Sequence, residues 1–159
     1  MQPTLRWMLG HPARIIAFGF GSGLIRPAPG TWGTLFGWLT YALFSRWIEG
    51  AWLLVPAAAA FLIGIAVCGK AGRDLGVADH GGIVWDEVAA IWLVLALIPD
   101  TPWSQLAGFL VFRFFDILKP PPIRYFDSHW KNGFGVMFDD LLAALYTLLL
   151  LALYYRISG

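Results

Sequence analysis

Charged residues and cysteines are scarce in this sequence. Of its 159 residues, 13% are charged and 58% are hydrophobic, whereas soluble domains are about 25% charged and about 45–50% apolar. The shortage of charge predicts either a very large core or a chain that uses lipid as part of its solvent. The net charge is +1, so no global field attracts nucleic acid and we expect no nucleic-acid partner.

The single cysteine, Cys68, excludes an intramolecular disulfide and a cysteine-based metal cluster. It lies in an apolar run, as a small buried apolar residue would. The first ten residues lack the basic flank, apolar run and small-residue cleavage site of a signal peptide. We therefore expect no cleaved leader, and at this length we expect one domain over residues 1–159.

Long apolar runs are abundant instead. Five of them are bounded by turn or breaker residues and are long enough to favour helices over strands. They cover Trp32–Trp47, Ala51–Gly69, Ile83–Ile98, Ser104–Leu118 and Phe138–Tyr155. Before them, Pro12–Phe20 predicts a short amphipathic helix at a membrane interface. The predicted fold is all-α: an integral-membrane helical bundle of about five long apolar helices plus a short N-terminal interfacial helix.

A soluble, tightly packed bundle is the alternative, because the apolar runs are short for a membrane. Ile83–Ile98 has 16 residues, about 24 Å as a helix, against a hydrocarbon core of about 30 Å. Tryptophan placement favours the membrane, since tryptophans cluster at helix ends as in an aromatic belt. Trp47, Trp52 and Trp103 fall at one set of ends, and Trp32 and Trp85 fall at the other.

Basic residues are distributed unevenly if the five helices cross in alternation. One face of the bundle, called here the first face, then collects the N-terminal segment and two loops, with Arg6, Arg14, Arg26, Lys70, Arg73, Lys119, Arg124 and Lys131. The opposite face holds only Arg46 and Arg156 outside the helix interiors. This excess predicts that the first face is cytoplasmic, with the amino terminus inside and the carboxyl terminus outside.

Five acidic residues fall on that same face. Asp86 and Glu87 open the third apolar run, Asp116 lies near the end of the fourth, and Asp139 and Asp140 open the fifth. Acidic residues in a first helical turn are often only caps. Here, the near-repetition of Trp-Asp-Glu-Val and Phe-Asp-Asp-Leu, with Asp116 at a matching depth, favours one joint site. Oxygen ligands without clustered His or Cys indicate a hard divalent ion, Mg²⁺ first.

Cationic side chains lie near these acids in the sequence. Arg113, Asp116 and Lys119 recur every three residues and share a helix face. They form either an intrahelical salt bridge with a snorkelling lysine or part of a phosphate site, in which Lys119 and Arg124 bind the anion.

Two loop segments are weaker candidates. The Gly- and Pro-rich segment 19–34 contains Ser22 and could bring backbone N–H groups to an anion, with Thr31 or Thr34 capping the helix that follows. An ordinary membrane-entry turn is the alternative. His80 precedes the first acidic pair and is either a proton donor to a leaving group or a surface histidine.

The chain resembles the phosphatidylglycerophosphatase A family, Mg²⁺-dependent lipid phosphatases of the bacterial inner membrane. The resemblance rests on four blocks in order: Phe20-Gly21-Ser22-Gly23-Leu24 with Pro29-Gly30-Thr31, Asp79-His80-Gly81-Gly82-Ile83-Val84-Trp85-Asp86-Glu87, Phe112-Arg113 to Asp116 with Lys119-Pro120 and Pro122-Ile123-Arg124, and Asp139-Asp140. It implies dephosphorylation of phosphatidylglycerophosphate to phosphatidylglycerol. Ala143-Ala144 departs from the expected Ala-Gly, which concerns helix packing more than chemistry.

The resulting hypothesis assigns one or two Mg²⁺ ions to Asp86, Glu87, Asp116, Asp139 and Asp140, with Lys119, Arg124 and Arg113 on the phosphate. Activated water and direct attack by an aspartate both remain open as routes. The signatures of histidine-dependent lipid phosphatases, haloacid-type phosphatases and CDP-alcohol phosphotransferases are missing from the sequence. A membrane cation or proton transporter that uses the same acids is the alternative function.

Overall fold

The computed structural model describes residues 2–159, and this part of the chain contains α-helices and two short 3₁₀ segments but no strand. The all-α class is therefore confirmed. The elements in chain order are α1 (Leu5–Leu9), α2 (Pro12–Ala17), η1 (Gly19–Leu24), α3 (Pro29–Phe44), η2 (Gly50–Leu53), α4 (Leu54–Leu75), α5 (Trp85–Leu97), α6 (Pro102–Leu118), α7 (Ile123–His129) and α8 (Gly133–Ser158).

The five predicted apolar runs correspond to α3, α4, α5, α6 and α8. Prolines mark several helix starts, because a first-turn residue needs no intrahelical N–H bond. Pro12, Pro29 and Pro102 open α2, α3 and α6. The short helix α7 lies in a segment that the sequence predicted as a loop.

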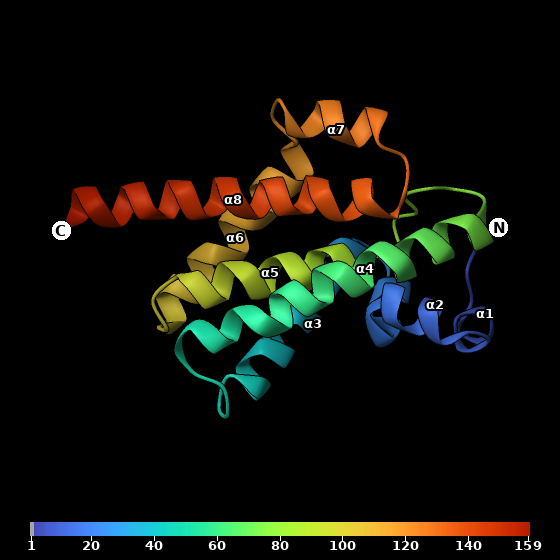
Figure 1. Cartoon of the computed structure of the whole chain (residues 1–159), viewed down its shortest axis with the longest axis horizontal. Helices are drawn as coiled ribbons and strands as arrows, with labels where there is room; N and C mark the ends of the chain where they lie inside the picture. The colour runs from blue at the N-terminus through green and yellow to red at the C-terminus, as the bar shows by residue number, and fades with distance from the viewer. Residues whose placement is uncertain (1) are drawn as a thin grey trace.

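Helix α5 lies at the centre of the bundle and packs against α3, α4, α6 and α8. Its apolar residues surround the whole helix, as expected for a buried element. Ile91 and Val94, for example, are fully buried. Figure 1 shows α5 between α4 and α8, with the two chain termini at opposite ends of the long axis.

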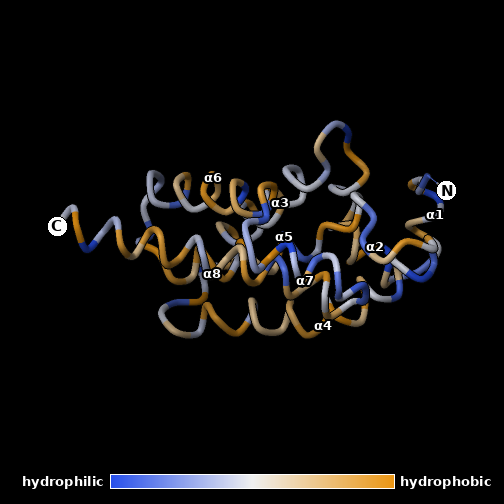
Figure 2. The backbone as a smooth tube through the Cα atoms, turned by 90° about the horizontal axis from the view of Figure 1, so that it is seen from above, coloured by the Kyte–Doolittle hydropathy of each residue, from blue (hydrophilic) through white to orange (hydrophobic). Residues whose placement is uncertain are grey.

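The outer helices present apolar side chains to the surroundings. Leu39 on α3, Leu62 on α4, Leu110 on α6 and Leu149 on α8 are all exposed. Figure 2 shows hydrophobic residues along most of these helices, with hydrophilic stretches frequent around α1 and α2. Such an apolar outer surface fits contact with lipid better than contact with water.

Within residues 2–159, two helices are long and apolar enough to cross a membrane: Gly50–Leu75, which joins η2 and α4, and Gly133–Ser158, which is α8. Helices α3, α5 and α6 have 16, 13 and 17 residues. At about 1.5 Å per residue they fall short of a hydrocarbon core of about 30 Å. Membrane association is thus supported, whereas five full-length crossings are not.

The exposed tryptophans agree with the predicted belt at one end of the bundle and in part at the other, where Trp32 is 42% exposed. Trp47, Trp52 and Trp103 are 75%, 73% and 80% exposed, as the prediction requires. Trp85 is buried, and its indole N–H donates to the carbonyl of Ala60 at 2.9 Å. The prediction was wrong for Trp85, because this side chain joins α5 to α4 inside the core.

Helices α4 and α8 touch at one end and separate toward the other (Figure 1). At the touching end, a Cβ on Gly133 would lie 2.0 Å from the carbonyl oxygen of Ile65 and 2.9 Å from the nitrogen of Gly69. Only a glycine permits so close an approach of two backbones. The contact therefore fixes where the two helices diverge.

We predict that Gly133→Ala lowers the free energy of unfolding by about 1–3 kcal/mol, because the added methyl group forces two backbones apart. Gly81→Ala is the matched control, since a Cβ there meets nothing within 4 Å and should change stability by less than about 0.5 kcal/mol. Thermal unfolding in detergent micelles measures both, and equal effects would refute the packing argument.

Candidate metal and phosphate site

The five acidic residues singled out in the sequence lie together at the ends of three helices. Asp86 and Glu87 occupy the first turn of α5, Asp116 the last turn of α6, and Asp139 and Asp140 the second turn of α8. All five side chains are buried. Because the helices alternate in direction, the start of α5, the end of α6 and the start of α8 meet on the same side of the bundle.

The first group of carboxylates consists of Asp86, Glu87 and Asp140. One oxygen from each lies within 4.8 Å of the others. Within residues 2–159, Asp86 Oδ1, Glu87 Oε2 and Asp140 Oδ2 are buried without a hydrogen-bond partner. Buried polar atoms are rarely left unsatisfied, and a carboxylate in an apolar environment is costly. These oxygens therefore fit a bound cation.

The second group consists of Asp79, Asp127 and Asp139, whose oxygens also lie within 4.8 Å of one another. Lys119 compensates this group: its Nζ donates to Asp139 Oδ2 at 2.9 Å and to Asp127 Oδ1 at 3.0 Å. Burial alone lowers the pKa of Lys119, but the ion pairs with Asp139 and Asp127 outweigh it and raise the pKa above its usual value. Lys119 therefore stays charged at neutral pH.

The backbone at the end of α6 directs Lys119 into the site. Pro120 follows, and the residue before a proline is disfavoured in the α conformation. Lys119 adopts a left-handed conformation with φ 49°, and its N–H still donates to the carbonyl of Phe115. For a residue other than glycine, this conformation costs on the order of 1–2 kcal/mol. The chain turns here, and the lysine reaches α7 and α8.

Arg113 links the remaining acids. It forms an ion pair with Asp116 and lies 3.9 Å from Glu87 Oε1 through Nη1. A Cβ on Gly30 would lie 3.0 Å from Glu87 Oε1 and 3.1 Å from Arg113 Nη2. The start of α3 therefore abuts this pair, and a larger residue there would displace it.

The charges of the site do not balance. The two groups of three, together with Asp116, make seven carboxylates, whereas their ion pairs among the described residues involve two cations, Arg113 and Lys119. Oxygen ligands of this kind suit a hard divalent ion such as Mg²⁺. The first group has no lysine partner among the described residues and is the better metal candidate.

Asp79 and Asp127 were not among the residues predicted for the site. Asp79 precedes His80 in a loop, and Asp127 lies on the unpredicted helix α7. A signal for Asp79 was its place in the Asp79-His80-Gly81-Gly82 block, whereas Asp127 reaches the site through tertiary packing of α7 on α8.

The predicted phosphate-binding residues occupy different surroundings. Arg124 is exposed at the start of α7, and its Nη2 donates to the carbonyl of Leu118 at 3.4 Å. Ser22 is buried and donates to the carbonyl of Gly19. Thr34 is fully buried and donates to the carbonyl of Gly30, whereas Thr31 is partly exposed in the first turn of α3.

Neither threonine caps α3, contrary to the prediction. The helix begins at Pro29, earlier than expected, and its N-cap residue is Ala28 in a left-handed conformation without a side-chain capping bond. Because proline fixes its own φ near the helical value, the helix starts there and both threonines fall inside it.

His80 shapes the loop before α5. Its Nδ1 accepts a hydrogen bond from the N–H of Gly82 at 3.0 Å, and its ring stacks on Phe18. Burial, with the nearby charge of Arg26, lowers the pKa of His80. At neutral pH the imidazole is therefore neutral, with its proton on Nε2.

The chain is similar to known proteins over most of its length. The family model described as phosphatidylglycerophosphatase A matches residues 15–155. The chain is 49% identical over 149 residues to the phosphatidylglycerophosphatase A of Haemophilus influenzae (93% of this chain, 91% of the relative). It is 37% identical over 139 residues to that of Escherichia coli (87% and 80%).

A third relative, from Bacteroides thetaiotaomicron, is 34% identical over 152 residues (91% of this chain, 94% of the relative) and is provisionally named a phosphatidylinositol-3-phosphatase. No solved structure matches the chain.

We predict that Lys119→Gln lowers the free energy of unfolding by about 1–3 kcal/mol, because it leaves Asp139 and Asp127 without their cation. The expected loss is below that of a fully buried pair, since the Lys119 side chain is 25% exposed. Lys70→Gln is the control: it removes a more exposed pair with Asp74 and should cost at most about 1 kcal/mol. Denaturation in micelles measures both, and a larger loss for Lys70→Gln would contradict the role given to Lys119.

Proposed function

The chain belongs to the phosphatidylglycerophosphatase A family of phosphatases, and we propose that it hydrolyses the terminal phosphomonoester of phosphatidylglycerophosphate with Mg²⁺ as cofactor. The products are phosphatidylglycerol and inorganic phosphate. The observation that carries the proposal is the group of buried, unpartnered carboxylate oxygens of Asp86, Glu87 and Asp140.

In this proposal Asp86, Glu87 and Asp140 hold Mg²⁺, and Asp139 and Asp116 lie beside them. When bound, the ion supplies positive charge that neutralises phosphate oxygens and activates water. Arg113 holds Glu87 and Asp116 in place through its ion pairs. Its buried Nε has no hydrogen-bond partner among residues 2–159.

Lys119 and Arg124 stabilise the phosphate in this proposal. Lys119 already bridges two acids, so a phosphate oxygen can replace one of them without moving the ammonium group far. Fixed cations of this kind stabilise charge that develops in the transition state. Arg124 is exposed at the start of α7, where it can meet a headgroup that arrives from the aqueous side.

We propose a bacterial inner (cytoplasmic) membrane location, with the site facing the cytoplasm and the amino terminus inside. The supporting observations are the apolar outer helices and the excess of basic residues in the segments on the site's side of the bundle. The polar headgroup then reaches the acids from the water-facing side while the lipid stays in the bilayer.

There are two alternatives to this proposal: a different lipid substrate, and a different class of function, ion transport. The name of the Bacteroides relative makes an inositol lipid phosphomonoester a second candidate substrate, but the two relatives named for phosphatidylglycerophosphate include the more similar sequence. For ion transport, buried acids would need to continue across the bundle. The buried acids of the described residues all lie at the site, which favours hydrolysis.

We predict that purified protein in micelles releases phosphate from phosphatidylglycerophosphate with Mg²⁺, and that excess chelator abolishes the release. Asp86→Asn should lose at least about a hundredfold in rate, as expected when a preorganised charged group is removed. Asp100→Asn is the control, because Asp100 lies on the connection from α5 to α6 at the far end of the bundle and accepts from Gln105. Full activity in chelator or in Asp86→Asn would refute the metal hypothesis.

For His80, we predict that replacement by alanine lowers the rate by less than about tenfold, because its ring supports the loop through Gly82 and Phe18. A positioned proton donor contributes about 10²–10⁴-fold. Rate measurements from pH 5 to 8 distinguish the two roles, and a loss of a hundredfold or more would identify His80 as the donor.

A further inference from the structure

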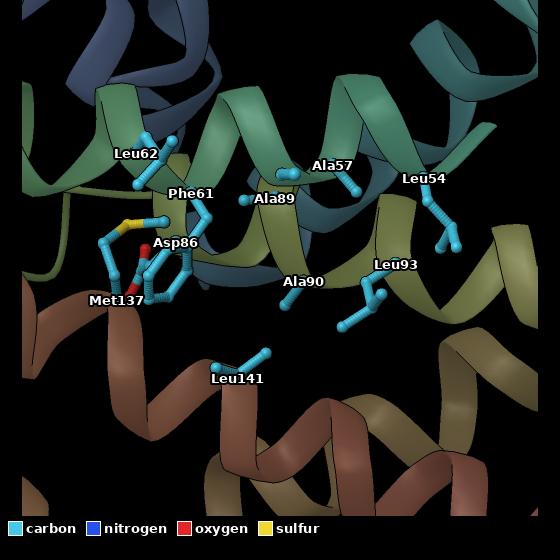
Figure 3. Close-up of a pocket in the computed structure, with 11 residues that line it drawn as sticks. Leu54, Ala57, Phe61, Leu62, Asp86, Ala89, Ala90, Leu93, Met137 and Leu141 are labelled. Carbon is cyan, nitrogen blue, oxygen red and sulfur yellow. The ribbon is translucent and has the colours of Figure 1, made fainter. Parts of the chain in front are cut away.

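An apolar groove runs along the outside of the bundle between α4 and α8, with α5 as its floor (Figure 3). Its volume is about 460 Å³, within the range of small-molecule sites. The residues that line it are apolar except for one carboxylate: Leu54, Ala57, Ala58, Phe61, Leu62, Asp86, Ala89, Ala90, Leu93, Met137 and Leu141.

The groove follows from the way the helices pack. Helices α4 and α8 are held together at Gly133 and diverge from there (Figure 1). The space between them is not filled, because α5 places the small side chains of Ala89 and Ala90 on its floor. Leu62 and Ala58, on the α4 wall, are exposed, so the groove opens sideways to the surroundings of the bundle.

One end of the groove reaches the acidic site. Figure 3 shows Asp86 beside Phe61 and Met137 at one end, and Leu54 and Leu93 at the other. Asp86 belongs to the carboxylate group that holds the ion in the proposed function. A ligand that fills the groove must therefore be apolar along its length and polar where it meets Asp86.

We propose that this groove binds an acyl chain of the lipid substrate and thereby sets the position of the headgroup at the acids. The inference rests on the proposed function, because it takes the substrate to be a membrane phospholipid. A water-soluble ligand would leave its polar groups unpaired against this lining. The sideways opening lets the chain enter from the bilayer without passing through water.

The groove contributes positioning rather than affinity. An acyl chain in the bilayer is already in an apolar solvent, so moving it against leucine and alanine gains little hydrophobic free energy. Holding the chain fixes the distance from the glycerol end to Asp86, and a misplacement of about 1 Å can cost about a hundredfold in rate. The expected signature is therefore a loss of kcat/KM that depends on the acyl chain.

The first test fills the groove. Ala58→Trp places a large ring in it, whereas Ala59→Trp adds the same ring to the next residue of α4, which is also exposed but does not line the groove. For long-chain phosphatidylglycerophosphate we expect kcat/KM to fall by about 10- to 100-fold in Ala58→Trp and to stay unchanged in Ala59→Trp. For a water-soluble glycerol phosphate ester without acyl chains, both variants should match the wild type.

Equal activity of the two variants on the long-chain lipid, with normal phosphate release by the wild type, would overturn the groove and leave the proposed function intact. If the wild-type protein releases no phosphate, the function fails, and the second test still decides whether the groove binds a lipid chain.

The second test uses the unmodified protein and a lipid with a photoactivatable group in its acyl chain. Irradiation followed by peptide mass spectrometry should place the label on α4, α5 and α8 residues of the groove when the lipid carries a phosphomonoester headgroup. Phosphatidylcholine with the same chain should label the groove several-fold less. Equal labelling by both lipids would show ordinary bilayer contact and overturn the proposal, as would labelling confined to other faces.

Discussion

Repulsion among clustered carboxylates, five of them buried, is the constraint on which the rest of this structure depends. Two groups of three acids and Asp116 share one end of an apolar bundle, where their ion pairs within residues 2–159 involve two cations, Arg113 and Lys119. Without further positive charge, several of these acids would have to take up protons. The lengths of the helices, the turn at Lys119 and the packing of α7 all serve to bring these acids and cations together.

The helices and most of the acids could be predicted from the sequence. Long apolar runs between breakers define helices without reference to the tertiary fold. Asp86 and Asp140 could be found because an acid at the start of an apolar helix is conspicuous, and because alternation of direction fixes which helix ends meet. This inference needs no knowledge of side-chain packing, because it depends only on the order of the helices and on their alternating directions.

Other features depend on contacts that the sequence does not encode locally. Trp85 resembles a belt residue until its indole N–H is seen to bond inside the core to Ala60. Helix α7 is short, and short helices owe most of their stability to packing. Asp127 therefore joins the site only when α7 folds onto α8.

Lys119 combines an unfavourable backbone conformation with a charge that two aspartates need. A left-handed residue at the end of a helix favours glycine, yet glycine has no side chain to neutralise two aspartates. The chain accepts a locally unfavourable backbone in exchange for a cation at this point. Such disagreement between local preference and the residue present is expected where the side chain is required for its charge. At the end of α6, the backbone preference for glycine and the requirement for a cation beside Asp139 and Asp127 therefore oppose each other at a single residue.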